Sequence, residues 1–546
     1  MSEAIELNPD GRSKTPQEDL DVVIVGAGFA GVYALYRMRA LGRRARVLDA
    51  AEGVGGTWFW NRYPGARCDV ESMQYSYSFS EEIQREWSWS ELYAAQPEIA
   101  RYINFVVDRL DLRKDIQLNA RVVSATFDEV ACEWAVRTEA GETFVAPICI
   151  MATGCLSVPV APDLKGLDTF KGRMVRTSDW PHEGVDLKGK RVGIIGTGSS
   201  GIQAIPVIAK EARHLFVFQR TPNYSIPARN RPMDPEYERG WKENYPRRRM
   251  LALETRNNTL NNAGKKSGLE VSRGEFEKEL ESRWKKGGIA FMYAYTDIAS
   301  NRAVNEATSD FVRRKIAEIV KDPVTAEKLT PHDYPIGTKR ICVDTEYFET
   351  FNRDNVTLVD VKKRPIKDIA HSGVLIGDKE YPVDVLVLAI GFDAMTGALM
   401  GIDITGRNGR KLRDDWKGGP KTYLGLMVSR YPNLFTITGP QSPSVFTNMV
   451  TSIEQHVDWI AACLTRMKER GERMVEAEEV AQDEWVAHAN QLADNTLLDL
   501  ANSWYVGANI AGKARVVMPY VGGAAKYLEI IQGVARNGYR GFRMSA

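Results

Sequence analysis

The stretch Asp21–Gly31, which reads DVVIVGAGFAG, constrains the fold of this chain more than any other. Four apolar residues, Val22–Val25, run directly into the pattern Gly26-x-Gly28-x-x-Gly31, and the apolar residues that follow recur at a helical spacing. The run is too short for a helix and too continuous for a half-exposed strand, so it predicts a buried parallel strand. Strand, glycine turn and helix together predict a dinucleotide-binding unit whose helix N-terminus faces the phosphates.

A second strand follows this helix and leads to an acid. The segment ARVLDA brings Asp49 to a position 23 residues after Gly26. A carboxylate there accepts hydrogen bonds from a ribose hydroxyl. A glycine pattern alone also occurs in chance turns, but the two strands, the helix and the acid together favour a nucleotide site.

The same unit occurs a second time. The strand RVGII leads into Gly196-x-Gly198-x-x-Gly201, then a helix, then the strand HLFVFQ. Arg220 and Thr221 follow that strand in place of an acid, and Arg220 is 24 residues past Gly196. Because a guanidinium and a hydroxyl suit a 2′-phosphate, the sequence favours NADPH over NADH. The alternative is a surface arginine with no role in cofactor choice.

Two further strands predict how the units are connected. One ends in Ala152-Thr153-Gly154 and another at Gly391. In flavoproteins with two nucleotide-binding units, such strands return the chain from one unit to the other. We therefore predict an α/β fold with two doubly wound, Rossmann-like domains. The predicted divisions are a flexible tail (1–19), a discontinuous FAD-binding domain (20–157 and 392–546) and an NADP-binding domain (158–391) that carries an inserted helical subdomain (233–333).

The segment Gly55–Ser72, GGTWFWNRYPGARCDVES, lies just past the second strand. Aromatic residues, glycines and arginines crowd it without a clear periodicity, so it predicts a loop. One interpretation is an aromatic-rich structural loop. The other is a loop that lies over a flat ring system and uses Arg67 and Asp69 as polar contacts.

The composition excludes several classes of partner. The chain has 72 Lys and Arg residues against 71 Asp and Glu, so its net charge of +1 gives no reason to expect binding to nucleic acid or an anionic membrane. No apolar run approaches the length of a membrane span, and the polar start is no signal peptide. The six cysteines include no C-x-x-C pair, which argues against zinc and against a disulfide reductase. We expect no metal, a cytoplasmic protein, and a monomer or weak homo-oligomer.

Several motifs place the chain beside a known family. GGTWFWNRYPG, FKGRMVRTSDWP before the second glycine turn, VFQRTPNYSIPARN, YPIGTKR, GPQSPS and SWYVGAN occur in order along the sequence. In these motifs the chain resembles the flavin-dependent Baeyer–Villiger monooxygenases, and within them the phenylacetone and steroid monooxygenase subgroup. The resemblance extends from about residue 20 to the C-terminus.

This resemblance implies a reaction. NADPH would reduce FAD, and the reduced flavin would take up O2 as a C4a-peroxide. The deprotonated peroxide would attack a ketone carbonyl, and the adduct would rearrange to an ester or lactone. NADP+ would stay bound and shield the peroxide from water.

The resemblance also implies roles for individual residues. Arg340 would be the catalytic cation beside the flavin, with Asp69 as its partner. The implied FAD contacts are Gly26, Gly28, Gly31, Asp49, Thr57, Trp58, Trp60, Asp69 and Tyr75. The implied NADP contacts are Arg67, Gly196, Gly198, Gly201, Gln203, Arg220, Thr221, Lys339 and Trp504. Leu156, Val445, Phe446 and Met449 would line the ketone pocket.

Physical chemistry fits an arginine at this position. An anionic peroxide needs a cation that cannot itself give up a proton. Two unit charges about 4 Å apart at an effective dielectric of about 20 attract by roughly 4 kcal/mol, which exceeds the ~1.4 kcal/mol of one pKa unit. Asp69 would place the guanidinium and balance its charge before oxygen arrives.

The chain departs from the family pattern in three places. The family fingerprint F-x-G-x-x-x-H-x-x-x-W has Arg176 at its histidine position, while Phe170, Gly172 and Trp180 stand as expected. The second connecting strand ends in Ala-Ile-Gly, and Cys155 follows Gly154. These changes leave the chemistry in place and bear on NADPH positioning, substrate range and coupling.

Two other functions compete with ketone oxygenation. A related flavin monooxygenase that oxygenates nitrogen or sulfur shares the two glycine turns. A non-catalytic, NADP-binding redox sensor would bind nucleotide without consuming NADPH and oxygen. The GGTWFWNRYPG segment and Arg340 favour ketone oxygenation.

Overall fold

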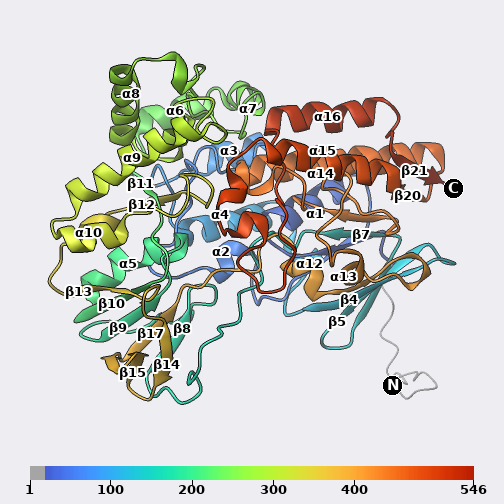
Figure 1. The fold of residues 1–546 in the computed structure, drawn as a ribbon. Coiled ribbons are helices and arrows are strands. Elements are labelled where there is room, and N and C mark those ends of the chain that lie inside the picture. Colours follow the sequence, from blue (N-terminus) through green and yellow to red (C-terminus); the bar gives the residue numbers. More distant parts are fainter. Residues whose placement is uncertain (1–18) are drawn as a thin grey trace.

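Two five-stranded parallel sheets organise the computed structural model, which describes residues 19–546 (Figure 1). The predicted tail over 1–19 therefore lies, apart from Asp19, outside the described residues. The first sheet has the order β19-β7-β1-β2-β3. Its strands are β1 (Val22–Val25), β2 (Ala45–Leu48), β3 (Ile116–Gln117), β7 (Ile148–Met151) and β19 (Leu434–Thr436).

The predicted opening unit is present in the first sheet. All four residues of β1 are buried, and β1 pairs in parallel with β2 and β7. The glycine turn then leads into α1 (Phe29–Ala40). Gly26 has φ +109°, and a Cβ on Gly31 would lie 1.7 Å from the Gly26 carbonyl oxygen. Glycine at these two positions is therefore what lets α1 begin directly on the end of β1.

The second sheet repeats this arrangement in the order β13-β10-β9-β17-β8, with every pair parallel. Its strands are β8 (Arg173–Arg176), β9 (Arg191–Ile195), β10 (His214–Gln219), β13 (Val356–Asp360) and β17 (Val385–Leu388). The helix α5 (Ser199–Glu211) follows its glycine turn. The α/β, doubly wound fold class is as predicted.

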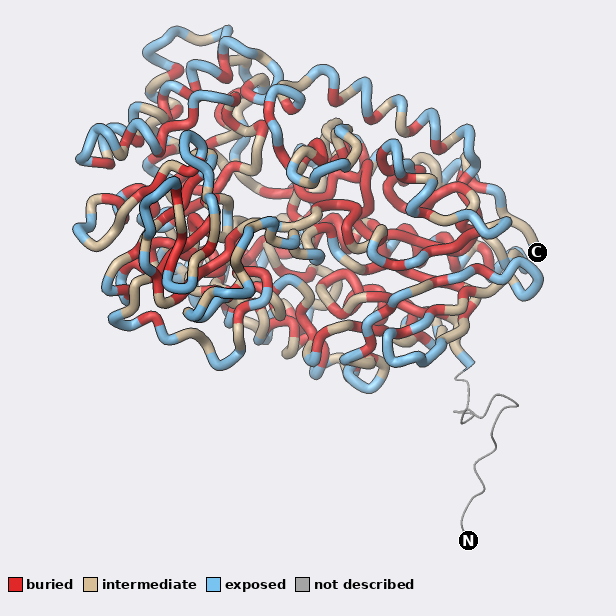
Figure 2. Tube along the Cα trace, turned by 60° about the horizontal axis from the view of Figure 1, so that its bottom comes forward, coloured by how far each residue is buried: buried red, intermediate tan, exposed pale blue. Residues whose placement is uncertain are grey.

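Helices and smaller sheets cover the first sheet. The helix α1 packs on α14 (Met449–Arg470), and α14 in turn contacts α16. The other helices of this half are α3 (Glu81–Glu86), α4 (Gln96–Arg109), α12 (Gly397–Gly401), α13 (Leu412–Asp415), α15 (Glu479–Asp494) and α16 (Ala524–Arg536). The smaller sheets comprise β4 (Val122–Asp128), β5 (Glu133–Thr138), β6 (Thr143–Ala146) and β18 (Asp403–Thr405), and the pair β20 (Met474–Ala477) with β21 (Phe542–Ser545). Figure 2 shows the buried segments of these layers beneath exposed loops and helices.

Residues 233–333 are helical and contain no strand. They lie between β11 (Ser225–Pro227) and β12 (Cys342–Asp344), two short strands that pair in parallel as a separate two-stranded sheet. The helices are α6 (Pro235–Lys242), α7 (Tyr245–Leu253), α8 (Arg273–Lys286), α9 (Arg302–Ile319) and α10 (Pro323–Leu329), along the top and left of Figure 1. After β12 come α11 (Tyr347–Thr350) and the sheet of β14 (Ile366–Ala370), β15 (Gly373–Ile376) and β16 (Lys379–Pro382).

One buried arginine fixes the helical segment to the first half of the chain. Arg249 of α7 is 6% exposed. Its Nη1 donates to the Gln74 carbonyl at 2.7 Å, and its Nη2 donates to the Ser76 carbonyl. A buried charge that loses such partners carries its full desolvation cost, so this contact resists separation of α7 from the 73–76 segment.

Two sequence predictions about local structure are wrong. Residues 57–60 of the expected 55–72 loop form the one-turn helix α2 (Thr57–Trp60), which packs against α4. The stretch QSPSVFTNMV (441–450) contains serines and a proline that predict a loop, but helix α14 begins within it at Met449. There Asn448 caps the helix by accepting a hydrogen bond from the Val450 N–H, a local contact that apolar periodicity does not report.

A buried histidine on α14 gives the fold a defined acid sensitivity. His456 Nδ1 accepts from the Thr438 N–H at 2.9 Å, and Nε2 lies 2.8 Å from the Tyr527 hydroxyl, which donates to the Leu424 carbonyl. Burial lowers the pKa of His456 to about 3. The folded pKa lies below the unfolded value of 6.5, so stability is complete above pH 6.5 and is lost as the pH falls towards 3.

We therefore expect His456→Asn to flatten the pH dependence of stability. Below pH 6.5, His456 lowers the wild type's free energy of unfolding by about 1.4 kcal/mol for each pH unit. Between pH 7 and 5, the wild type should therefore lose about 2 kcal/mol more of its free energy of unfolding than the variant does. Urea unfolding at both pH values measures this difference. His371→Asn, at an exposed position, should keep the wild-type slope. Parallel slopes for wild type and His456→Asn would contradict the assignment.

Candidate active site

The loop 333–340 and the 55–72 segment meet at a partly buried ion pair. Arg340 Nη2 donates to the Asp69 carboxylate, and Arg340 Nη1 donates to the Val445 carbonyl at 2.7 Å. The side chains of Arg340 and Asp69 are 26% and 27% exposed. Three segments far apart in the sequence thus fix one guanidinium, and the two residues predicted as the catalytic pair are in contact.

This pair keeps Arg340 charged. Burial by itself would lower the pKa of the guanidinium, but the charge of Asp69 and its hydrogen bond outweigh burial and raise the pKa above its ordinary value. The cation therefore persists over the whole range in which an enzyme works. It offers a fixed positive charge to negative charge that develops on a nearby oxygen.

An apolar cluster adjoins the cation. Val445 and Phe446 lie on a short 3-10 turn (Ser444–Phe446), and the Val445 carbonyl is the one that accepts from Arg340. The same cluster contains Cys155, Leu156, Met449 and Trp504. All four residues predicted to line a ketone pocket, and the predicted NADP contact Trp504, thus gather in one cluster beside the ion pair.

Sequence reasoning missed Tyr505 in this cluster. Its ring centroid lies 4.6 Å from that of Phe446 and 4.3 Å from that of Trp504. Burial raises the pKa of Tyr505 to about 12, and the nearby Arg340 acts in the opposite direction. Tyr505 is therefore neutral. Its position directly after Trp504 in SWYVGAN was the only available signal.

The predicted FAD contacts gather around the first glycine turn and the 55–75 segment. Asp49 stands just past β2, where its carboxylate accepts from the Ala27 N–H at 2.5 Å and the Ala51 N–H at 2.8 Å. Burial raises its pKa, against these two hydrogen bonds. Trp58 Nε1 donates to the Tyr75 hydroxyl at 3.1 Å. Thr57, Trp58 and Trp60 all lie on α2.

The two glycine-turn units meet through Gln203 of α5. Gln203 Oε1 accepts from the Tyr63 hydroxyl at 2.9 Å, and Gln203 Nε2 donates to the Arg67 carbonyl at 3.1 Å. The side chain of Arg67 pairs with Glu91 at 2.7 Å. Of the predicted NADP contacts, Arg67 and Gln203 are therefore in direct contact. A Cβ placed on Gly198 would meet nothing within 4 Å, so the N-terminus of α5 has room for a phosphate.

Two more of the predicted NADP contacts, Arg220 and Thr221, lie just past the carboxyl end of β10. Arg220 is exposed, and the Thr221 carbonyl accepts from the Thr197 hydroxyl of the glycine turn at 3.0 Å. Burial and then the charge of Arg220 lower the pKa of Lys339, which places these two cations within electrostatic reach of each other. Lys339 and Arg340 are adjacent in sequence, so the loop 333–340 places one cation near Arg220 and the next one beside Asp69.

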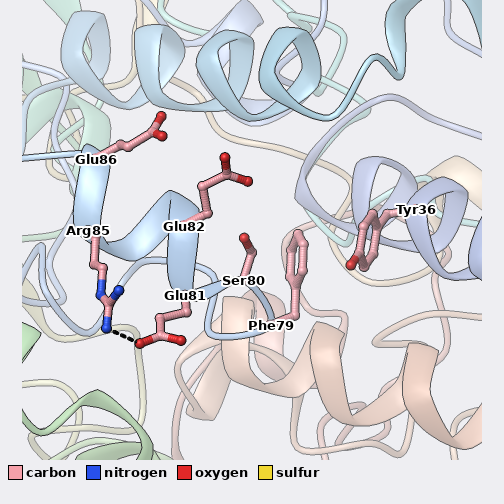
Figure 3. Close-up of a pocket in the computed structure, with 7 residues that line it drawn as sticks. All are labelled: Tyr36, Phe79, Ser80, Glu81, Glu82, Arg85 and Glu86. Carbon is pink, nitrogen blue, oxygen red and sulfur yellow. Dashed lines mark hydrogen bonds and ion pairs between the residues drawn. The ribbon is translucent and has the colours of Figure 1, made fainter.

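A surface hollow of about 630 Å³ lies elsewhere, between α1 and α3 (Figure 3). Its lining residues are Tyr36, Phe79, Ser80, Glu81, Glu82, Arg85 and Glu86. Glu81 pairs with Arg85, and Arg109 pairs with both Glu82 and Glu86. Its acids are already paired with arginines, and it contains no residue that the sequence predicts for the active site.

Known proteins are similar in sequence to this chain over almost its full length. Residues 20–245 match the family model for pyridine nucleotide-disulphide oxidoreductases. A Baeyer-Villiger monooxygenase from Pseudooceanicola batsensis is 43% identical over 534 residues, which cover 96% of each chain. This chain belongs to the Baeyer–Villiger monooxygenases. It is also 41% identical to phenazine N-monooxygenase PhzNO1 from Lysobacter antibioticus, over 96% of each chain.

Solved structures of Baeyer–Villiger monooxygenases share the fold. Steroid monooxygenase bound to NADP is 49% identical, with a TM-score of 0.93 over 96% of this chain and 99% of that one. OTEMO in complex with FAD and NADP is 39% identical, with a TM-score of 0.93 over 97% and 100%. Like them, this monooxygenase is an oxidoreductase that uses FAD and NADP, and its two glycine turns, Asp49 and Arg220 fit two dinucleotides.

The departure at the family fingerprint lies on an edge strand of the second sheet. Arg176 is the last residue of β8, at the edge of the second sheet, where β8 pairs with β17. Its carbonyl accepts from the Asp179 N–H at 3.3 Å. In this monooxygenase the fingerprint segment is thus a strand end and turn.

Within residues 19–546, no helix combines the length and apolar character that crossing a bilayer requires.

Proposed function

We propose that this monooxygenase inserts one oxygen atom beside the carbonyl of a ketone, giving an ester or lactone, with O2 as the oxygen source. The observation that carries this proposal is the Arg340–Asp69 pair, whose arginine is hydrogen-bonded to the carbonyl of a residue in the apolar Val445–Phe446 cluster. When bound, FAD supplies the oxygen-activating redox chemistry with electrons from NADPH. We assign FAD to the first glycine turn and NADP to the second.

The chain's own residues have separable tasks in this proposal. Arg340 stabilises negative charge on the reacting oxygen, because its guanidinium cannot give up a proton there. Asp69 fixes the direction of the guanidinium as a positioning residue. The apolar cluster around Phe446 holds the ketone and keeps water out, which strengthens the electrostatic effect of the cation.

A panel of ketones tests the proposal by product identification. Incubation with NADPH and O2 should give esters or lactones that carry one added oxygen atom, labelled when 18O2 is supplied. Product identity is the decisive measurement, because uncoupled oxidation also consumes NADPH. NADPH consumption without oxygenated product from any ketone would contradict the proposal.

The second candidate function is oxygenation of nitrogen or sulfur. It is favoured by the 41% identical relative named phenazine N-monooxygenase. Paired assays with a cyclic ketone, an aromatic N-heterocycle and a thioether distinguish the two. We expect ketone oxygenation to have the highest kcat/KM, and exclusive N- or S-oxide formation would favour the second candidate.

Phe446→Ala should admit bulkier ketones and loosen the regiochemistry of oxygen insertion. The partly buried ring of Phe446 fills a large volume, and its loss leaves space beside Tyr505. Product ratios with small and bulky ketones measure the effect. Phe105→Ala removes a partly buried ring from α4 and should cost thermal stability without changing the product pattern. The same behaviour in Phe446→Ala would make Phe446 an ordinary core residue.

The surroundings of the reaction are also proposals. All six cysteines are free, as a reducing cytoplasm would keep them. We infer a cytoplasmic enzyme that acts as a monomer or weak homo-oligomer on small-molecule ketones.

A further inference from the structure

The neighbouring parallel strands β10 and β13 end side by side on the carboxyl side of the second sheet, and a cation lies shortly after each of them. Gln219, the last residue of β10, pairs with Asp360, the last residue of β13. The Gln219 carbonyl also accepts from the Val361 N–H at 2.9 Å, so the segments that follow the two strands start side by side. Arg220 directly follows Gln219 on one segment, and Lys362 lies two residues past Asp360 on the other. Both side chains are exposed.

The loop 333–340 joins this edge through a tyrosine. The Tyr334 hydroxyl lies 2.8 Å from both the Pro222 carbonyl and Asn223 Oδ1, just past Arg220. Lys339 Nζ lies 4.9 Å from the centroid of the Tyr334 ring. Tyr334 therefore holds Lys339 close to the segment that carries Arg220.

An ion pair joins Lys362 to the same loop. Lys362 Nζ pairs with the carboxylate of Asp333, the residue before Tyr334. The side chains of Lys362 and Asp333 are 55% and 57% exposed, so water screens their attraction and the pair exchanges partners easily. The pKa of Lys339, lowered by burial and then by Arg220, also responds to both of these charges.

We propose that Lys362 is a third cation for the 2′-phosphate of NADP, beside Arg220 and Lys339, and that Asp333 holds it in place when no phosphate is present. A phosphate monoester carries about −1.5 to −2 charge at pH 7, so it attracts the lysine more strongly than a single carboxylate does. Once the 2′-phosphate is bound, the Asp333 carboxylate lies near a second anion, and this repulsion weakens NADP binding. The inference rests on the proposed placement of NADP at the second glycine turn.

Calorimetric titration of the FAD-loaded enzyme with NADP+ and NAD+ tests this. Lys362→Ala should weaken NADP+ binding about fivefold or more and change NAD+ binding less than twofold. Lys363→Ala removes the same charge from the next exposed residue and should change both less than twofold. Asp333→Asn should tighten NADP+ binding several-fold. Equal melting temperatures show that the variants are folded.

Two results would overturn the inference. One is a loss of NADP+ affinity in Lys362→Ala no larger than in Lys363→Ala, and the other is an equal loss for NAD+. Arg220→Ala, titrated in parallel, separates this failure from that of the placement. If Arg220→Ala weakens NADP+ binding while Lys362→Ala does not, NADP is placed correctly and Lys362 has no part. If neither weakens it, both proposals fail.

Discussion

Arg340→Ala should still allow NADPH to reduce FAD while ester formation falls by at least about 10²–10³-fold, the usual effect of removing one preorganised charge. The guanidinium contacts Asp69 and the Val445 carbonyl and neither glycine turn, so both nucleotides should still bind. What is lost is the fixed positive charge, which the oxygen-insertion step needs and flavin reduction does not.

Arg340→Lys should not restore ester formation. Arginine uses one nitrogen for Asp69 and another for the Val445 carbonyl, and an ammonium group lacks the planar fork that serves both partners. Arg353→Ala removes an exposed arginine from the second half of the chain and should keep wild-type product formation.

Two measurements check the role of Arg340. Anaerobic stopped-flow spectroscopy follows flavin reduction by NADPH, and subsequent mixing with O2 and ketone followed by chromatography measures ester. Ester formation by Arg340→Ala at nearly the wild-type rate would show that another group supplies the charge.

Arg220→Asp should sharply raise the KM for NADPH and leave the KM for NADH much less changed. The substitution removes a charge-assisted contact and places a carboxylate near the 2′-phosphate. We expect a cost on the order of 2–3 kcal/mol, or roughly 30–150-fold in relative KM. Because Arg220 is exposed, the effect should shrink in high salt.

Steady-state kinetics with both nucleotides at low and high ionic strength measure this preference. Arg213→Asp is the matched control, since Arg213 is also exposed but precedes β10 at the opposite end of the strand. It should leave the NADPH-to-NADH ratio unchanged. An unaltered preference in Arg220→Asp would remove this residue from cofactor selection.

The parts of the fold that were predictable depend on short, local patterns. Val22–Val25 and the strand RVGII are buried on both faces of a parallel sheet, and such strands are continuous apolar runs. The turn after each strand needs glycine for close approach, which leaves a pattern in the sequence. Burial and backbone geometry therefore made both units visible without any knowledge of tertiary contacts.

The parts that were not predictable depend on contacts between distant segments. Tyr505 belongs to the candidate site only because the fold brings its segment beside the segments that carry Phe446 and Arg340. Helix α2 is a single turn, too short to develop an apolar period, and tertiary packing against α4 accompanies it. The pairing of Arg340 with Asp69 came from resemblance, since no spacing rule connects residues 271 positions apart.

The order of strands in the first sheet has a consequence for the synthesis of this protein. Strand β19 completes that sheet by pairing with β7, yet roughly 280 residues, including the whole second sheet, separate Met151 from Leu434. At ribosomal rates of about 5–20 residues per second, the β7 edge emerges on the order of half a minute before its partner. An unpaired strand edge invites pairing with other chains. We therefore expect expression of this enzyme to gain most from chaperones that cover the β7 edge until β19 is made, or from a low temperature that slows association with other chains.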